Sequence, residues 1–289
     1  MAANSTPERH DAALKASQQS VWDGVASGWE KWDAFHELHT TAVNEWLCTS
    51  AALTPGKTLL DLASGSGQPA LRAARIVFPG GRVIATDIAP QMVEVVKRRA
   101  AAEGISNLEA RVMDIERMDL ADESVDAVIC RWGYMFCPDL DAAMAHSKRV
   151  LRPRGRLSLA VWSRPEDNPW LGLFVSALDR VAPQSAPADP DALGPFRLAD
   201  PQRLTGVLRN AGFADYSLEA ISFRFDFESP EQWWEFVIDI AAPVRKRIAS
   251  LDGPAQAEVK RLVVAESDRF LFDGKIQLPA ANLCAVATR

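Results

Sequence analysis

Short apolar runs alternate with amphipathic stretches through the middle of the chain. The apolar runs are rich in Val, Ile and Leu, as in strands buried on both faces, and they occupy residues 57–63, 82–88, 107–115, 124–133 and 156–162. Between them apolar residues recur every three or four positions, which predicts helices at 68–78, 90–104 and 140–155. The alternation predicts β-α-β units and hence a mostly parallel sheet covered by helices on both faces.

The two ends of the chain follow different patterns. Residues 1 to about 15 are predicted to form a loose polar tail, and residues 21–53 carry apolar side chains at the spacing of two amphipathic helices. Beyond Trp162 we expect helices at 168–181 and 200–213, separated by a Pro-rich surface loop at 183–196. Residues 215–227 alternate like a strand near a sheet edge, and 277–289 is the predicted antiparallel partner.

These elements predict an α/β fold. It is a Rossmann-like, doubly wound sheet of seven strands with an antiparallel last strand, N-terminal helices and a helical lid insertion. We expect residues 1–55 to form an N-terminal tail and helical cap, and residues 56–165, 200–228 and 276–289 to form the ligand-binding α/β core. Residues 166–199 and 229–275 are expected to form the lid and to border a substrate pocket.

Charge and composition narrow the class of partner. The 289 residues carry a formal net charge of -6, with an isoelectric point near 5.4, so nucleic acid and anionic membrane surfaces are not expected partners. No apolar run reaches the roughly 18 residues of a membrane span, and the chain does not begin like a secretion signal, so we expect a cytoplasmic protein that binds a small molecule. Cys48, Cys130, Cys137 and Cys284 show no CxxC or zinc-like spacing, which predicts free thiols and no metal site.

The sequence LLDLASGSGQPAL (59–71) places a Gly-rich turn directly between a predicted strand and a predicted helix. In a parallel sheet such a turn lies at the carboxyl edge, where ligands bind. Gly65, Gly67 and Ala70 satisfy the G-x-G-x-x-A pattern of dinucleotide-binding proteins, and Asp87 follows at the distance of a ribose-binding acid. A nicotinamide-dependent oxidoreductase, using NAD or NADP, is therefore one hypothesis.

A second interpretation draws on the residues around this turn. Asp61 and Ala63 extend it to D-x-A-x-G-x-G, which resembles the D/E-x-G-x-G-x-G loop of class I S-adenosylmethionine-dependent methyltransferases, with Ala in place of the first Gly. Asp87 and Asp114 stand in register at the ends of the second and third strands. RVLRPRGRLSLAVW (149–162) resembles the family's helix-to-strand passage, with Arg where the family has the first Gly of a PGG turn.

The resemblance covers about residues 20 to 162 and is closest to the small-molecule branch that includes ubiquinone and menaquinone methyltransferases. It implies that S-adenosylmethionine is the cofactor and that a methyl group moves to a small acceptor, giving S-adenosylhomocysteine. It also implies that Asp87 accepts from the ribose hydroxyls, that Ile88 and Ile115 sandwich the adenine, and that Asp114 accepts from the adenine amino group. The implied cofactor-binding residues are Trp29, Asp61, Ala63, Ser64, Gly65, Gly67, Asp87, Ile88, Met92, Asp114, Ile115, Arg131 and Trp132.

The acceptor is expected to be hydrophobic or aromatic. Nine tryptophans are unusually many, and several lie in segments that border the acceptor pocket of related enzymes. Core packing is the alternative explanation for the same residues. The candidate substrate-pocket residues are Trp22, Trp32, Trp170, Trp233 and Trp234.

Methyl transfer is an in-line displacement, so alignment in a dry site supplies most of the rate. A general base is needed only where the acceptor must lose a proton. His36 and His39, on an N-terminal helical segment, are the candidates, with a packing or solvated role as the alternative. His146 is expected at the surface.

Two questions stay open from the sequence, and one alternative is set aside. A protein of this fold that binds the cofactor without methylating is a second alternative function. Metalloid methylation, which uses cysteine trios, is disfavoured by the spacing of Cys48, Cys130 and Cys137. A homodimer is possible, and nothing in the sequence decides between it and a monomer.

Overall fold

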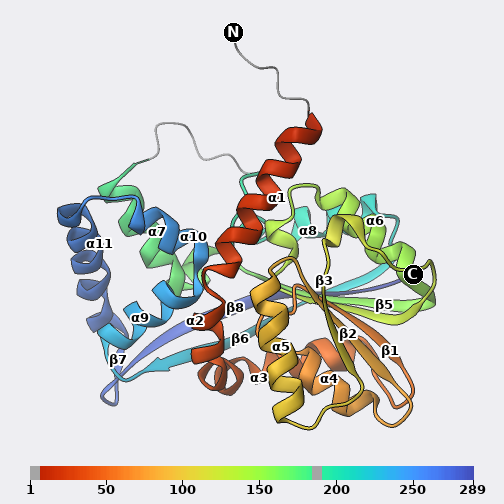
Figure 1. Ribbon diagram of the computed structural model, residues 1–289. Coiled ribbons are helices and arrows are strands. Elements are labelled where there is room, and N and C mark those ends of the chain that lie inside the picture. Colours follow the sequence, from red (N-terminus) through yellow and green to blue (C-terminus); the bar gives the residue numbers. More distant parts are fainter. Residues whose placement is uncertain (1–6, 184–190) are drawn as a thin grey trace.

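The computed structural model describes residues 7–183 and 191–289 of the chain. Its strands are β1 (Thr58–Leu62), β2 (Arg82–Asp87), β3 (Leu108–Val112), β4 (Val125–Arg131), β5 (Leu151–Trp162), β6 (Asp215–Phe227), β7 (Leu271–Phe272) and β8 (Lys275–Thr288). They form one sheet in the order β3-β2-β1-β4-β5-β8-β6, with β7 paired to β8 outside this path (Figure 1). Strands β1 to β5 run parallel, and β8 lies antiparallel between β5 and β6. The predicted α/β class is confirmed, with the short β7 as an addition to the seven expected strands.

Helices cover both faces of this sheet. They are α1 (Pro7–Asp23), α2 (Ala26–Lys31), α3 (Asp33–Ser50), α4 (Ala70–Val77), α5 (Pro90–Ala102), α6 (Leu140–Val150), α7 (Pro169–Val181), α8 (Pro201–Asn210), α9 (Pro230–Ile240), α10 (Ala242–Ala249) and α11 (Gly253–Glu266). On one face α3 and α4 bury Leu47 and Val77 in a cluster with Leu59 of β1. On the other face α6 and α8 bury Met144 and Leu208 in a second cluster. The strands are therefore covered on both sides, as their apolar runs predict.

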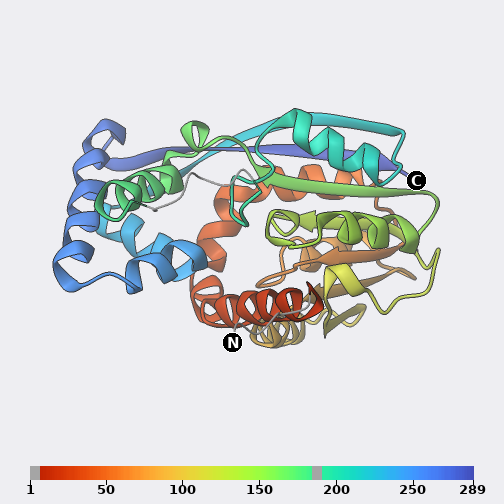
Figure 2. The same cartoon turned by 90° about the horizontal axis from the view of Figure 1, so that it is seen from above.

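Strands β6 and β8 extend past the parallel strands, and α7, α9, α10 and α11 gather around that extension (Figures 1 and 2). Two indole hydrogen bonds tie this helical group together and to the rest of the molecule. Trp233 Nε1 donates to the Trp170 carbonyl at 2.8 Å, and Trp32 Nε1 donates to the Asp239 carboxylate at 2.8 Å. The helices expected within 229–275 are thus present, while their action as a lid and the three-part division of the chain remain predictions.

The N-terminal segment differs from its expected form. Residues 1–6 lie outside the described part, but α1 begins at Pro7, so the predicted loose tail to about residue 15 is wrong. Helix α1 contacts α5 on one side and α10 on the other, and Figure 1 shows it crossing between the parallel strands and the helical group. The polar residues of this segment predict a solvated tail, but in the structure Lys15 meets a charged partner instead of solvent. Its Nζ pairs with Asp114 at 2.7 Å.

Strand β5 begins directly after α6, where the sequence predicts helix to residue 155. Leu151 already pairs with Val125 of β4, and after a register shift Arg156 pairs with Ala127. The residues between bulge outward, and Arg154 has φ +66°, in the left-handed region that favours glycine. That conformation explains why the resembling family has Gly in this turn. In the described residues no helix has the length and apolar character needed to cross a membrane.

Candidate functional site

A cavity of about 1270 Å³, counted with the solvent at its mouth, lies at the carboxyl ends of β1, β2 and β4. Its floor is formed by residues that end or follow these strands, and its apolar walls come from α1, α2, α7, α9 and α10. Of the implied cofactor-binding residues, those in the lining are Trp29, Ala63, Ser64, Gly65, Asp87, Ile88, Met92, Asp114, Ile115, Arg131 and Trp132. Asp61 and Gly67 lie behind the lining. The assignment of these residues to a cofactor stays a prediction.

The Gly-rich turn has the backbone that its glycines suggest. Ala63 and Gly65 have φ +52° and Gly67 has φ +112°, all in the left-handed region. A Cβ at Gly65 would meet no atom within 4 Å, so this residue opens onto free space in the cavity. A Cβ at Gly67 would instead lie 3.0 Å from the Leu71 side chain, so this residue packs against the start of α4.

Ala63, which replaces the family's first Gly, is accommodated by a second glycine. A Cβ built on Gly133 would lie 2.7 Å from the Cβ of Ala63 and 2.7 Å from Cys130 Sγ, closer than such atoms approach. The extra methyl of Ala63 therefore occupies space that residue 133 leaves empty. The methyl points toward the chain after β4 and leaves the Gly65 opening clear.

Gly133→Ala is expected to destabilise the protein by about 1–3 kcal/mol, because overpacking at a rigid contact forces the backbone to move. Thermal unfolding of G133A measures this loss. The double variant A63G/G133A removes one of the two close contacts and should recover part of the stability. Equal unfolding temperatures for G133A and A63G/G133A would contradict the proposed contact between residues 63 and 133.

Asp87 ends β2 with its carboxylate held by backbone donors. One oxygen accepts from the Gly65 amide and the other from the Ala89 amide, both at 2.9 Å. Burial raises the pKa of Asp87 to about 6, against the lowering effect of these amides. The carboxylate is thus fixed at the cavity floor and ionised above that pH, and its remaining lone pairs are available to hydroxyl donors.

Asp61 is buried directly beneath the turn. Neither carboxylate oxygen has a well-formed hydrogen bond in the described residues, although the Ala70 amide is near enough to oppose the effect of burial. Burial raises the pKa of Asp61 to about 7, and the positive charge of Arg131 acts in the opposite direction. A buried carboxylate without partners is costly. A hydrogen-bond donor that reached Asp61 from the cavity would therefore be bound favourably.

The raised pKa values of Asp61 and Asp87, about 7 and about 6 against 3.8 in the unfolded chain, predict a pH-dependent stability. The folded state holds these protons more tightly, so the stabilisation is complete below about pH 4 and is lost as the pH rises through 6 to 7. The Asp61→Asn side chain cannot ionise. The unfolding temperature of D61N minus that of wild type should therefore increase as the pH is raised from about 5 to about 8. A difference that stays constant with pH would contradict a buried, titrating Asp61.

Asp114 faces a lysine from the first helix. Lys15 Nζ lies 2.7 Å from Asp114 Oδ2 and 2.7 Å from Glu116 Oε2. Burial opposes the charge of Lys15, yet the hydrogen bonds to these two carboxylates raise its pKa overall. One oxygen of Asp114 also accepts from the Glu116 amide at 2.9 Å. The carboxylate implied to hold an adenine amino group is therefore already paired with α1.

Apolar side chains stand beside these acids. Ile88 follows Asp87, Ile115 follows Asp114, and Met92 lies on the first turns of α5, all in the cavity lining. These apolar side chains and the Asp87 and Asp114 carboxylates line the same cavity. A planar heterocycle with exocyclic donors fits this chemistry.

His36 is the titratable group that the structure places most unexpectedly. It is 3% exposed, lines the cavity, and neither ring nitrogen has a hydrogen-bond partner in the described part of the chain. Its ring stacks on Trp29 with centroids 4.7 Å apart. Burial, and then the charge of Arg131, lower the pKa of His36 well below 6.5. The ring is therefore a neutral imidazole, and both of its nitrogens are buried at the cavity wall without a hydrogen-bond partner among the described residues.

His39, the other candidate base, does not line the cavity. Its Nδ1 lies 2.7 Å from the Phe35 carbonyl, and its Nε2 accepts from the Asp226 amide at 3.2 Å. Both nitrogens are used to join α3 to β6, which indicates a structural role. His146 is partly buried beside Arg149 on α6 and also lies outside the cavity lining.

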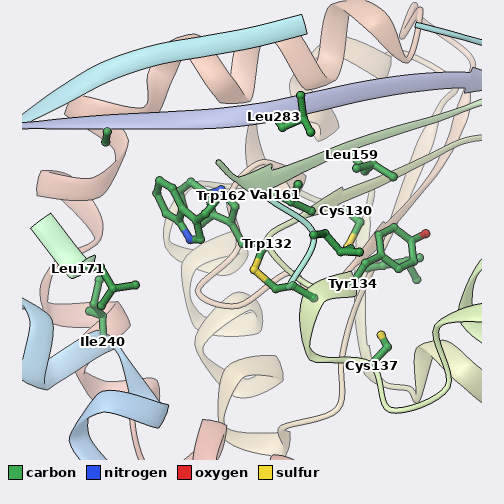
Figure 3. Close-up of a cluster of buried hydrophobic side chains, with 14 of the residues drawn as sticks. Cys130, Trp132, Tyr134, Cys137, Leu159, Val161, Trp162, Leu171, Ile240 and Leu283 are labelled. Carbon is green, nitrogen blue, oxygen red and sulfur yellow. The ribbon is translucent and has the colours of Figure 1, made fainter. Parts of the chain in front are cut away.

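Trp132 forms one wall of the cavity and is held in a rare conformation. Its φ of +61° is uncommon for a bulky residue and typical of functional sites where surrounding contacts impose the strain. The Trp132 amide donates to the Ala160 carbonyl at 2.8 Å, and its Nε1 donates to Asn282 Oδ1 at 2.5 Å. Its ring stacks on Trp162 at 4.3 Å, and Figure 3 shows this pair with Leu171 and Ile240 across from it.

The candidate substrate-pocket tryptophans divide into two groups. Trp22 and Trp170 line the cavity, and Trp22 packs edge-on against Phe136 with centroids 4.9 Å apart. Trp32, Trp233 and Trp234 do not line it. Their rings pack among α3, α7 and α9, where Trp32 and Trp233 are buried and Trp234 stacks on Phe174 at 5.2 Å, so core packing explains these three.

Several lining residues were missed by the sequence reasoning. Lys15 and Gln18 lie in the segment interpreted as a tail, and Trp162 ends β5, a position at the carboxyl edge that could have been identified. Glu116 and Gly133 directly follow the predicted Ile115 and Trp132, and most of the others come from segments that no local pattern brings together. The missed lining residues are Lys15, Gln18, Glu116, Gly133, Phe136, Cys137, Pro138, Trp162, Leu171, Pro195, Ile240, Ala241, Pro243 and Val244.

The four cysteines are free and buried, as predicted. Cys48 belongs to the cluster under α3, whereas Cys130 and Cys137 belong to the cluster on the opposite face of the sheet. Burial raises the pKa of Cys48 and Cys130 to about 12. These three thiols neither converge nor ionise, so they do not form the trio that metalloid chemistry requires.

Comparison with known proteins places this geometry in a family. Residues 60–159, which contain the Gly-rich turn, Asp87 and Trp132, match the methyltransferase domain family. The chain is 30% identical to an arsenite methyltransferase of Halobacterium salinarum, over 68% of this chain and 48% of that protein. This chain spans about half the length of several curated relatives. The activity, acceptor and partners of the protein are therefore proposed below.

Other relatives match over most of their length. The ubiquinone/menaquinone biosynthesis C-methyltransferase UbiE of Acidiphilium cryptum is 31% identical over 71% of this chain and 84% of that protein. The fold is similar to that of the YcgJ protein of Bacillus subtilis, with a TM-score of 0.56 and 19% identity over 86% of this chain and 98% of that chain. The chain therefore belongs to the class I S-adenosylmethionine-dependent methyltransferases.

Proposed function

We propose that the protein transfers a methyl group from S-adenosylmethionine to a small hydrophobic or aromatic acceptor in this cavity, with His36 receiving the acceptor's proton. The observation that carries the proposal is His36 itself. It is a buried, neutral imidazole with both nitrogens unpartnered in the described residues, and it faces a cavity that also holds the Gly-rich turn and Asp87.

The residues present fit the cofactor. Asp87 offers a fixed carboxylate to the two ribose hydroxyls, Gly65 leaves room for the ligand to approach the backbone, and Asp61 has unused acceptors nearby. Ile88 and Ile115 supply apolar contacts for the adenine ring. When bound, S-adenosylmethionine supplies a methyl group on a positively charged sulfur, a leaving group that needs no further activation.

The acceptor is assigned to the remaining part of the cavity. Trp22, Trp132, Trp162, Trp170 and Leu171 line the cavity, and we assign the acceptor to their apolar surface. Indole and aliphatic surfaces favour an apolar ring or chain and exclude water from the reacting atoms. An oxygen or carbon acid on such a ring would meet His36 as the nearby proton acceptor.

The proton transfer leaves the charge of the cavity unchanged. As the acceptor bonds to the methyl carbon, the methyl–sulfur electron pair stays on sulfur and the positive charge of the sulfonium disappears. The acceptor's proton passes to a nitrogen of His36, which becomes an imidazolium. One positive charge therefore moves between two neighbouring groups, so the low pKa of His36 does not prevent its use as a base.

Incubation with S-adenosylmethionine and a panel of phenols, 1,3-dicarbonyl compounds and amines tests the proposal, with mass spectrometry of both products. We expect S-adenosylhomocysteine and a methylated product with an aromatic hydroxyl or carbon acid. If S-adenosylhomocysteine binds in calorimetry but no acceptor of the panel is methylated, the alternative of a cofactor-binding protein without methyl transfer gains support and the proposed reaction fails.

A further inference from the structure

Arg131 ends β4 as a buried guanidinium in the cavity floor. It is 8% exposed and lines the cavity, and its plane lies over the Trp132 ring at 4.5 Å. Nη1 donates to Asn44 Oδ1 at 2.8 Å and to Thr40 Oγ1 at 3.2 Å, both neutral oxygens of α3. Nε and Nη2 have no hydrogen-bond partner among the described residues. Within this part of the chain the guanidinium therefore donates only through Nη1, and its Nε and Nη2 donors remain free.

The acids around Arg131 do not pair with it. Within the described ranges no carboxylate lies within 4.0 Å of its nitrogens. Glu37 is bound by Arg72 at 3.1 Å and Asn44 at 2.8 Å, and Asp33 is bound by Arg99 at 2.5 Å. The buried Asp61 is close enough to raise the pKa of Arg131, but the larger effect of burial lowers that pKa to about 10.

A buried cation with no carboxylate in direct contact is costly, and an anionic ligand that reached its free edge would relieve that cost. Resting on the proposed function, we infer that Arg131 is the oxyanion-binding residue of the cavity and receives a carboxylate on its free Nε and Nη2 edge. Two bound molecules could supply that carboxylate, the amino-acid end of the cofactor or an acidic acceptor. Arginine suits either, because its planar fork matches a carboxylate.

Calorimetry with a matched pair of ligands distinguishes the two sources. S-adenosylhomocysteine carries a carboxylate, and 5′-methylthioadenosine lacks the whole amino-acid end. If the cofactor supplies the anion, Arg131→Gln should weaken S-adenosylhomocysteine about 10- to 100-fold, the loss of one or two charged hydrogen bonds, and change 5′-methylthioadenosine less than about twofold. If the acceptor supplies it, the same variant should weaken benzoate but not benzamide, both titrated into the S-adenosylhomocysteine complex.

Two further variants separate binding from folding. Arg131→Lys keeps the charge and should retain part of the affinity for the same carboxylate, while Arg209→Gln removes an arginine from the exposed end of α8 and should change nothing. Equal affinities of wild type and R131Q for both carboxylate ligands, or equal losses for each ligand and its neutral counterpart, would overturn the inference alone. Failure of the wild type to bind S-adenosylhomocysteine would overturn the proposed function with it.

Discussion

Asp87→Ala is expected to reduce the affinity for S-adenosylhomocysteine by at least about 100-fold, because hydrogen bonds to a charged acceptor contribute about 1.5–3 kcal/mol each and two ribose hydroxyls would lose theirs. The carboxylate is already oriented by the Gly65 and Ala89 amides, so the ligand does not have to order it. Titration calorimetry of wild type and D87A measures the difference directly.

Asp87→Asn is the matched control for this prediction. The amide keeps one oxygen acceptor but turns its NH2 group toward the second backbone amide, so D87N should bind weakly and unfold somewhat below the wild-type temperature because one of the two backbone hydrogen bonds is lost. Because the pKa of Asp87 is about 6 in the free protein, wild-type affinity should also fall as the pH drops below 6, and that fall should be absent in D87N. Unchanged affinity in D87A would remove Asp87 from the site.

His36→Ala is expected to lower kcat by about 10²- to 10⁴-fold with any acceptor that loses a proton, the range typical of a missing general base. The affinity for S-adenosylhomocysteine should stay near that of wild type, since the role assigned to His36 concerns the acceptor. Since burial and the charge of Arg131 keep the pKa of His36 well below 6.5, protonation of His36 should not reduce the wild-type rate on going from about pH 7.5 to about pH 6.5.

His39 supplies the matched control for the histidine prediction. Both of its ring nitrogens join α3 to β6, so His39→Gln should lower the unfolding temperature and leave kcat close to that of wild type. Equal losses of kcat in H36A and H39Q would indicate that the α3 segment affects activity through packing. In that case the proton would go to solvent or to another group.

The floor of the cavity could be predicted from the sequence because it is local. The turn after β1, Asp87 and Asp114 each follow a strand that the apolar pattern identifies, and parallel strands bring their carboxyl ends together. Ala63 was recognised as a departure, but its compensation by Gly133 could not be predicted. That contact joins two loops 70 residues apart in the sequence, and it depends on the exact approach of their backbones.

The walls could not be predicted, because they are assembled from helices that no local rule brings together. Leu171, Ile240 and Val244 come from α7, α9 and α10 and meet only through the packing of these helices beyond the sheet. The two candidate histidines illustrate the same limit. Three residues apart, His36 and His39 were expected on roughly one helical face, yet the angle between their directions is enough to turn one into the cavity and the other toward β6.

The central claim is that the cavity is built for an adenosyl sulfonium ligand held by Asp87 at its ribose. Parallel calorimetric titrations of the wild-type protein with S-adenosylhomocysteine and with NADH test this claim most directly. We expect saturable binding of S-adenosylhomocysteine at one site per chain and no heat from NADH. Binding of NADH together with no response to S-adenosylhomocysteine would contradict it.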